Sequence, residues 1–245
     1  MPAWRGSIGR LAMGPSSRAR VAGLLYLIVI AAGAASLVIT PSLIVPGNAA
    51  ATANNIMASE TAYRFGIFVN LIATAAYVGV VAMLFELLRP AGASFSAVAA
   101  FFGLTGCIVS AVNGLTWLAP LALLKNPASL AALETAELQA LSFVWLRLSG
   151  AGGNLALTFF GFYCLTLGFT IAGATFLPRV LGLLLAISGV AWLTGGFATL
   201  LAPAFASQIS TYTMATAVFG ESMLTMWLLL FGVNDAKWSA QAGRS

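Results

Sequence analysis

One carboxylate, Glu221, stands inside a long apolar run near the end of the sequence, in the segment GESMLT. An acidic side chain in such a place can carry a proton, hold a cation, pair with an arginine or act as a general acid or base. Two arginines, Arg64 and Arg147, and two asparagines, Asn70 and Asn154, occupy the first turns of other apolar runs. These five side chains are the candidates for chemistry in this chain.

The spacing of the polar residues predicts a common face and a common depth. Asn70, Asn154 and Glu221 are each followed by a threonine four residues later, and residues four apart share one face of a helix. When residues are counted from the expected start of each helix, the asparagines lie about two turns deeper than the arginines. By the same count Glu221 lies about 14 Å below the start of its own helix. The outer half of the even-numbered helices is therefore expected to contain one polar layer.

Three interpretations of this layer are open. In a structural one, Glu221 pairs with Arg64 or Arg147, and the asparagines only join helices by hydrogen bonds. In a binding one, an outward-opening polar pocket binds or moves a small ligand, the arginines attract an anionic or amide-bearing group, and Glu221 is a proton or cation site. In a catalytic one, Glu221 acts alone as general acid or base, since no Ser–His or Cys–His pair exists. The pocket is the leading specific hypothesis.

The composition places these residues in a membrane protein. Of 245 residues, 60% are hydrophobic and 7% are charged, whereas soluble domains contain about 25% charged residues. Histidine is absent, which removes the commonest general base and transition-metal ligand, so neither a metal nor another cofactor is expected. The net charge of +5 comes from basic residues at the ends of apolar runs, where they act as topology signals rather than as a nucleic-acid surface. The expected partner is the lipid bilayer.

Six apolar runs are long enough to cross a bilayer as helices, which takes about 20 residues each. The fold class is therefore all-α, a bundle of six transmembrane helices. The six runs cover residues 21–39, 65–88, 95–117, 149–172, 180–201 and 212–233. We expect a basic leader at 1–19, one membrane domain at 20–234 and a tail at 235–245, with the first span uncleaved because its leader and its run exceed signal-peptide dimensions.

The connections differ between the two faces. Asn48 and Ser129 can each cap a short helix, and both helices are expected to lie on the outer membrane surface. Most basic residues fall on the opposite face, which predicts that both termini lie in the cytoplasm. Those residues are Arg5, Arg10, Arg18, Arg20, Arg89, Arg179, Lys237 and Arg244. Cys107 and Cys164 fall mid-span and are expected to be packing residues, with a bridge open only if spans three and four pair antiparallel.

Two similar segments suggest an internal repeat. RVAGLL at 20–25 opens the first span, and RVLGLL at 179–184 opens the fifth. Repeated units are common in membrane transport folds. Three helical hairpins in one orientation would explain the similarity, although their exact register stays open.

Several segments together resemble an uncharacterised bacterial family of multi-pass membrane proteins, catalogued as domain of unknown function 4386. The resemblance rests on RVAGLLYLIVIAAG at 20–33, LIVPGNAAATANNIMASETAYRFG at 43–66, LLRP at 87–90 and FFGLTGCIVSAVNGLTWLAPLALL at 101–124. It extends over about 18–234. The resemblance implies a six-helix protein of the bacterial inner membrane, and it implies no activity.

Overall fold

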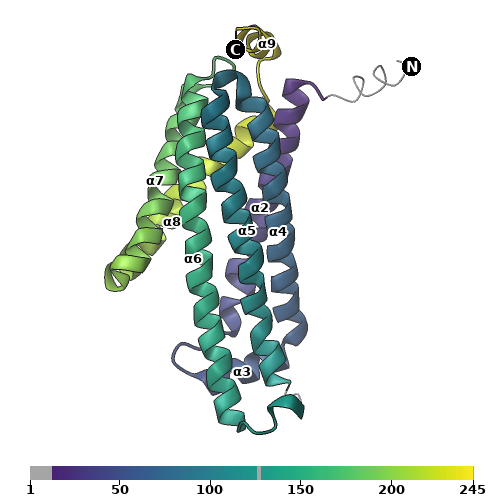
Figure 1. The fold of residues 1–245 in the computed structure, drawn as a ribbon, viewed down its shortest axis with the longest axis vertical. Helices are drawn as coiled ribbons and strands as arrows, with labels where there is room; N and C mark the ends of the chain where they lie inside the picture. Colours follow the sequence, from purple (N-terminus) through teal and green to yellow (C-terminus); the bar gives the residue numbers. More distant parts are fainter. Residues whose placement is uncertain (1–12, 126–127, 245) are drawn as a thin grey trace, which may run out of the picture.

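The computed structural model of the chain describes residues 13–125 and 128–244. Six of its helices are long and apolar enough to cross a membrane, which confirms the predicted fold class. These helices are α2 (Pro15–Ile39), α4 (Glu60–Leu88), α5 (Ala93–Leu124), α6 (Thr135–Gly173), α7 (Arg179–Leu201) and α8 (Pro203–Leu230). The start of α2 and the C-terminal helix α9 (Asp235–Ala242) lie at the same end of the bundle, which we call the terminal end (Figure 1).

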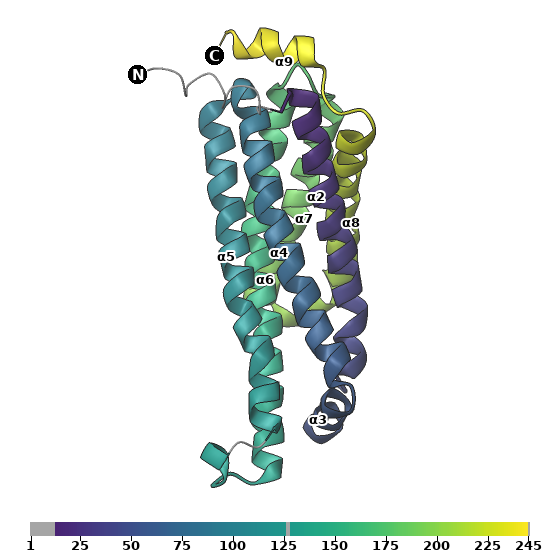
Figure 2. The ribbon, with the colours of Figure 1, turned by 90° about the vertical axis from the view of Figure 1, so that its right-hand side faces the viewer.

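We call the opposite end of the bundle the α3 end. At this end several helices are longer than the spans predicted from the sequence. Helix α6 begins fourteen residues before the expected start of the fourth span, and α8 begins nine residues before that of the sixth. With 39 residues, α6 is about 58 Å long, roughly twice the apolar thickness of a bilayer. Helices α5 and α6 extend furthest at this end (Figure 2). Leader residues 1–12 lie outside the described part of the chain.

One of the two predicted surface helices is present as a separate element. Helix α3 (Ala49–Ala58) follows Asn48, whose side-chain oxygen accepts a hydrogen bond from the Ala51 backbone N–H at 2.9 Å. The second is not separate, because the segment after Ala128–Leu130 runs without a break into α6. Glu134 and Glu137 form a capping box that starts α6 there, so the helix begins in the surface segment itself. The expected cap at Ser129 involves a side chain outside the described ones.

The six long helices form a closed ring in chain order. Each packs against the helix before it and the helix after it, and α8 closes the ring against α2. The similar segments RVAGLL and RVLGLL each use their glycine to contact a neighbouring helix. Gly23 of α2 packs on Leu229 of α8, and Gly182 of α7 packs on Gly168 of α6. Both glycines lie where an odd-numbered span meets the preceding even-numbered one. Two of the three expected hairpins thus make a similar glycine contact, and the threefold repeat stays a prediction.

Helices α6 and α7 meet backbone to backbone. A Cβ atom added at Gly189 would lie 2.5 Å from the Leu165 nitrogen, and one at Gly161 would lie 3.1 Å from the Gly189 oxygen. Glycines of this kind let membrane helices approach closely and gain van der Waals contact. The α6–α7 contact therefore fixes the distance between the two helices at this level of the bundle.

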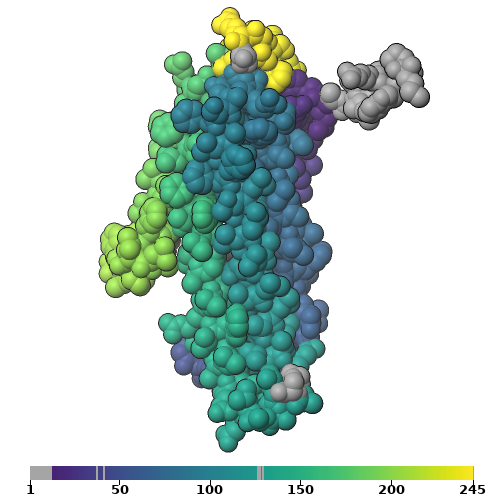
Figure 3. All heavy atoms as spheres, in the orientation of Figure 1, coloured from purple at the N-terminus to yellow at the C-terminus, as the bar shows by residue number. Residues whose placement is uncertain are grey.

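The joint between α7 and α8 stands away from the side of the bundle (Figure 3). Consistent with this, nearly every residue of α8 from Pro203 to Thr216 is exposed or partly exposed. The second half of α8 returns to the ring, where Ala217, Glu221 and Leu224 are buried. The cysteines considered as a bridge are also buried in the bundle, and both are free.

Candidate functional site

The structure places Glu221 at a different depth from the other four candidates. Glu221 lies nine residues before the last residue of α8, about 14 Å from the terminal end. By the same measure, Asn70 and Asn154 lie about 27 and 29 Å from that end, and Arg64 and Arg147 about 36 and 39 Å. The apolar core of a bilayer is about 30 Å thick, so the arginines lie at its far surface and Glu221 near its middle.

Neither arginine pairs with Glu221. Arg64 has another partner, and Arg147 has no ion-pair partner among the described residues. Arg64 donates to Glu60 at 2.7 Å, one turn away on α4, and Lys125 also contacts that carboxylate at 2.8 Å. Arg147 is exposed. At the far surface both side chains can reach water, so neither needs a buried carboxylate. The Arg–Glu221 pair of the structural interpretation is therefore not what the structure contains.

The asparagines are also separate from Glu221. Asn70 is exposed, and the amide of Asn154 donates to the Gly150 carbonyl of its own helix at 3.2 Å. Asn113, near the α3 end of α5, instead joins two helices by donating to the Ser149 carbonyl of α6 at 2.9 Å. The five predicted side chains thus do not meet in one place, and Glu221 has a different set of neighbours.

Glu221 is 8% exposed and lies among neutral side chains from the surrounding helices. Its Oε1 accepts a hydrogen bond from the Trp192 indole N–H of α7 at 2.6 Å and from the Cys164 thiol of α6 at 3.6 Å. The Tyr26 side chain of α2 lies near this carboxyl. Helices α2, α6 and α7 therefore converge on one carboxyl group of α8.

Three tyrosines complete the surroundings. Tyr26 and Tyr77 share a hydrogen bond between their hydroxyls at 3.3 Å, and their rings meet edge to face at 5.5 Å. The ring of Tyr163 lies 5.9 Å from that of Tyr77, and its buried hydroxyl has no hydrogen-bond partner among the described residues. We call these three tyrosines, Cys164, Trp192 and Glu221 the Glu221 cluster.

Close glycine contacts position the cluster. Cys164 lies three residues after Gly161 on α6, and Trp192 lies three residues after Gly189 on α7. Gly161 and Gly189 let α6 and α7 pack backbone to backbone at this level, and a donor from each helix reaches the same oxygen. Gly220 lets α8 approach α7 in the same way, since a Cβ there would lie 2.5 Å from the Leu184 oxygen. The carboxyl is thus held by helix packing and not by a loop.

The charge balance of the cluster is unusual. Among the residues the structure describes, no arginine or lysine forms an ion pair with Glu221. Taking an isolated carboxylate out of water costs far more free energy than burying a neutral acid. The arrangement can therefore hold a proton on Glu221, or a cation beside it. A catalytic role for Glu221 requires a second reactive group nearby, and the Cys164 thiol is such a group. Both Glu221 and Cys164 are buried, however.

Most of the cluster was missed by reasoning from the sequence. The sequence predicts Cys164 as a packing residue, and it singles out neither Trp192 nor the three tyrosines. One signal was present, because Tyr and Trp buried in an apolar run usually need a hydrogen-bond partner for their polar atom. Tyr26, Tyr77 and Tyr163 all lie within predicted spans, close to the depth at which Glu221 is found.

Comparison with known proteins agrees with the architecture. No match was found among the curated proteins or among the solved structures. A family model covers nearly the whole membrane domain, from the second residue of the RVAGLL segment to the end of α8. Since this model, described as Domain of unknown function (DUF4386), matches residues 21–232, the chain is a multi-pass membrane protein that belongs to that family.

Proposed function

We propose that this protein is a carrier for a small polar molecule and that Glu221 is its proton-binding group. The observation that carries the proposal is the buried Glu221 carboxyl, which has donors from Trp192 and Cys164 but no cation among the described residues. Ionisable groups inside a membrane are rare and mark ion pathways and proton relays. A carboxyl that gives up and takes up a proton couples ligand movement to a proton gradient.

The Tyr163 hydroxyl supports this function. It is buried, lies beside Tyr77 and has no hydrogen-bond partner among the described residues. An unpaired buried hydroxyl costs free energy unless water, an ion or a ligand group binds it. Next to a carboxyl without a counter-ion, it suits a proton pathway better than a purely structural core.

In this proposal the route to Glu221 follows the first half of α8, from the side of the bundle where the α7–α8 joint stands (Figure 3). Between Pro203 and Glu221 this helix has six Ser, Thr or Gln side chains, each exposed or partly exposed on the surface of the protein. They are Ser207, Gln208, Ser210, Thr211, Thr213 and Thr216. A membrane helix that presents this many polar groups is better suited to a water-filled path than to lipid. Arg64, Asn70, Arg147 and Asn154 lie on α4 and α6 and are not part of this route.

A pH jump on proteoliposomes tests the proton-binding group. On a solid-supported membrane, a change from alkaline to mildly acidic buffer is expected to give a transient current as protons enter the protein. Glu221→Gln is expected to lose this current while its free energy of unfolding changes by less than about 1 kcal/mol, because glutamine has the shape of a neutral acid. Infrared difference spectra should lose one carboxyl band in the same variant.

The matched control is Glu86→Gln, which removes an exposed carboxyl at the terminal end that contacts Arg89 at 3.8 Å. This control should keep the transient current of the wild type. An unchanged current in Glu221→Gln would overturn the proposal. A large loss of stability in Glu221→Gln without any wild-type current would favour the structural interpretation.

We also propose that the membrane is the bacterial cytoplasmic membrane and that the terminal end faces the cytoplasm. The basic residues at this end, among them Arg18, Arg89 and Arg179, support the orientation. Cysteine labelling with a membrane-impermeant maleimide tests it: a cysteine added after Ser245 should react only once the membrane is opened. Reaction in intact cells would contradict the orientation.

A further inference from the structure

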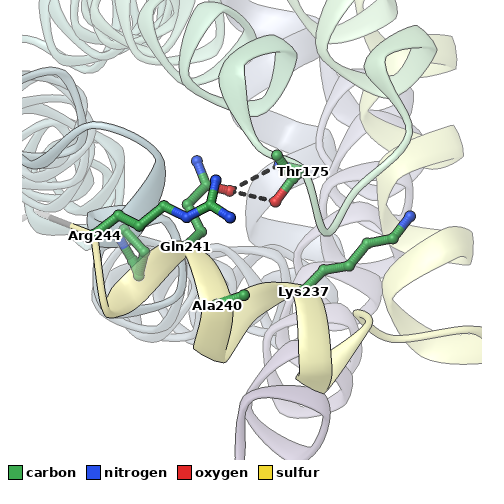
Figure 4. Close-up of a pocket in the computed structure, with 6 residues that line it drawn as sticks. Thr175, Lys237, Ala240, Gln241 and Arg244 are labelled. Carbon is green, nitrogen blue, oxygen red and sulfur yellow. Dashed lines mark hydrogen bonds between the residues drawn. The ribbon is translucent and has the colours of Figure 1, made fainter.

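A second site, distinct from the Glu221 cluster, lies at the terminal end beneath α9. There the structure has a hollow of about 500 Å³ lined by Pro90, Thr175, Lys237, Ala240, Gln241 and Arg244 (Figure 4). A second hollow of about 460 Å³ shares Thr175 and Lys237 with the first. Volumes of this size are typical of sites for small ligands.

The floor of the first hollow is rigid and its hydrogen bonds are already used. The Gln241 side-chain oxygen accepts from the Thr175 backbone N–H at 2.9 Å and from the Thr175 hydroxyl at 2.7 Å. Its amide nitrogen donates to the Gly173 carbonyl at 3.3 Å. These bonds tie α9 to the turn between α6 and α7, so the hollow keeps its shape without a ligand.

Two cations remain free to bind an anion there. Lys237 of α9 and Arg244, two residues beyond the end of that helix, are exposed and line the same hollow. Neither forms an ion pair with a described residue. In Figure 4 the two side chains lie on either side of the Gln241–Thr175 pair. An arginine fork and a lysine ammonium together are the donors that proteins use for phosphate groups.

The second hollow is lined by both aromatic and polar side chains, the polar ones being Thr175, Asn234 and Lys237. It is lined by Trp227 and Phe231 at the end of α8, whose rings lie 4.6 Å apart, and Phe231 is 63% exposed. This aromatic surface belongs to a membrane-spanning helix, and the shared Lys237 joins it to the charged hollow. A ligand that matches both parts has a phosphate and an acyl chain.

We propose that this site binds an anionic phospholipid of the leaflet at the terminal end, its phosphate between Lys237 and Arg244 and its acyl chain against Trp227 and Phe231. Basic pockets at the ends of membrane helices recognise such headgroups, and each cation near the membrane surface strengthens binding about fivefold. This inference does not depend on the proposed role of Glu221.

Native mass spectrometry of the detergent-solubilised protein tests the site, with phosphatidylglycerol and phosphatidylcholine of the same acyl chains as probes. The wild type is expected to prefer phosphatidylglycerol. Lys237→Ala and Arg244→Ala should each weaken phosphatidylglycerol binding about fivefold and the double variant about 25-fold, with phosphatidylcholine binding unchanged. Lys237→Arg, which keeps the charge, should retain the preference.

The matched control is Arg179→Ala, which removes an exposed cation of the same end that does not line the hollow. If Arg179→Ala weakens binding as much as Lys237→Ala, the effect is that of surface charge alone and the site is refuted. If inorganic phosphate at millimolar concentration displaces the lipid and alone raises the unfolding temperature, the ligand is free phosphate and the lipid assignment is wrong. Equal unfolding temperatures of all variants in phosphatidylcholine would show that they fold.

Discussion

Gly168→Ala is expected to lower the free energy of unfolding by about 3 kcal/mol, although it adds a single methyl group. The new Cβ would lie 2.6 Å from the Gly182 carbonyl oxygen and 2.7 Å from the Ala186 nitrogen, both backbone atoms of α7. A side chain can rotate away from such a clash, whereas a helix backbone can only move as a whole. Helix α7 must therefore shift, which loosens the contacts along the α6–α7 interface.

Unfolding of the purified protein by an added denaturing detergent measures this loss. Gly150→Ala is the matched control, since it makes the same change on the same helix at a position where the new atom meets nothing within 4 Å. This control should stay within about 0.5 kcal/mol of the wild type. Equal losses in the two variants would mean that the contact with α7 does not set the result, because alanine has a higher helix propensity than glycine and propensity alone would give a gain. Gly182→Ala, which meets the Gly168 oxygen at 2.5 Å, should behave like Gly168→Ala.

The sequence predicts the helices well at the terminal end and less well at the α3 end. At the terminal end, apolar runs stop at basic residues and at prolines such as Pro90 and Pro178, so hydropathy and helix boundary coincide. At the α3 end, α6 continues beyond the bilayer as the segment that begins at Thr135. Where a helix extends beyond the membrane, its residues are no longer apolar but its backbone hydrogen bonds continue. Hydropathy therefore cannot show where such a helix begins.

The same effect explains the misplaced depth of Glu221. The polar residues of α8 before Tyr212 hide the true start of the helix at Pro203, and counting from the apolar run puts Glu221 too close to the α3 end. The partner of Arg64 was accessible to sequence reasoning, because Glu60 precedes it by four residues on one helix. The partners of Glu221 were not, since Trp192 and Cys164 reach it only through contacts between three helices.

Trp192→Phe is expected to destabilise the protein chiefly by removing the 2.6 Å hydrogen bond to Glu221. A buried acceptor that loses its donor costs about 1–3 kcal/mol, and the smaller ring adds a packing loss. A double-mutant cycle with Glu221→Leu separates the two, because the packing loss is common to both backgrounds. The coupling free energy is expected to be about 1.5 kcal/mol. A coupling near zero would show that the indole does not bind the carboxyl.

Repeating the cycle in the Glu221→Gln background reports the charge of the resting side chain. Glutamine offers the indole a neutral carbonyl oxygen of the same shape, and hydrogen bonds to ionised groups are about twice as strong as those between neutral groups. If Glu221 carries a proton at rest, Trp192→Phe should cost nearly the same in the Glu and Gln backgrounds. If the cost falls by half or more in the Gln background, the resting group is an ionised carboxylate. A carrier that takes up its proton at Glu221 before it moves a ligand requires the first result, because only the neutral acid avoids the cost of an unpaired charge in mid-membrane.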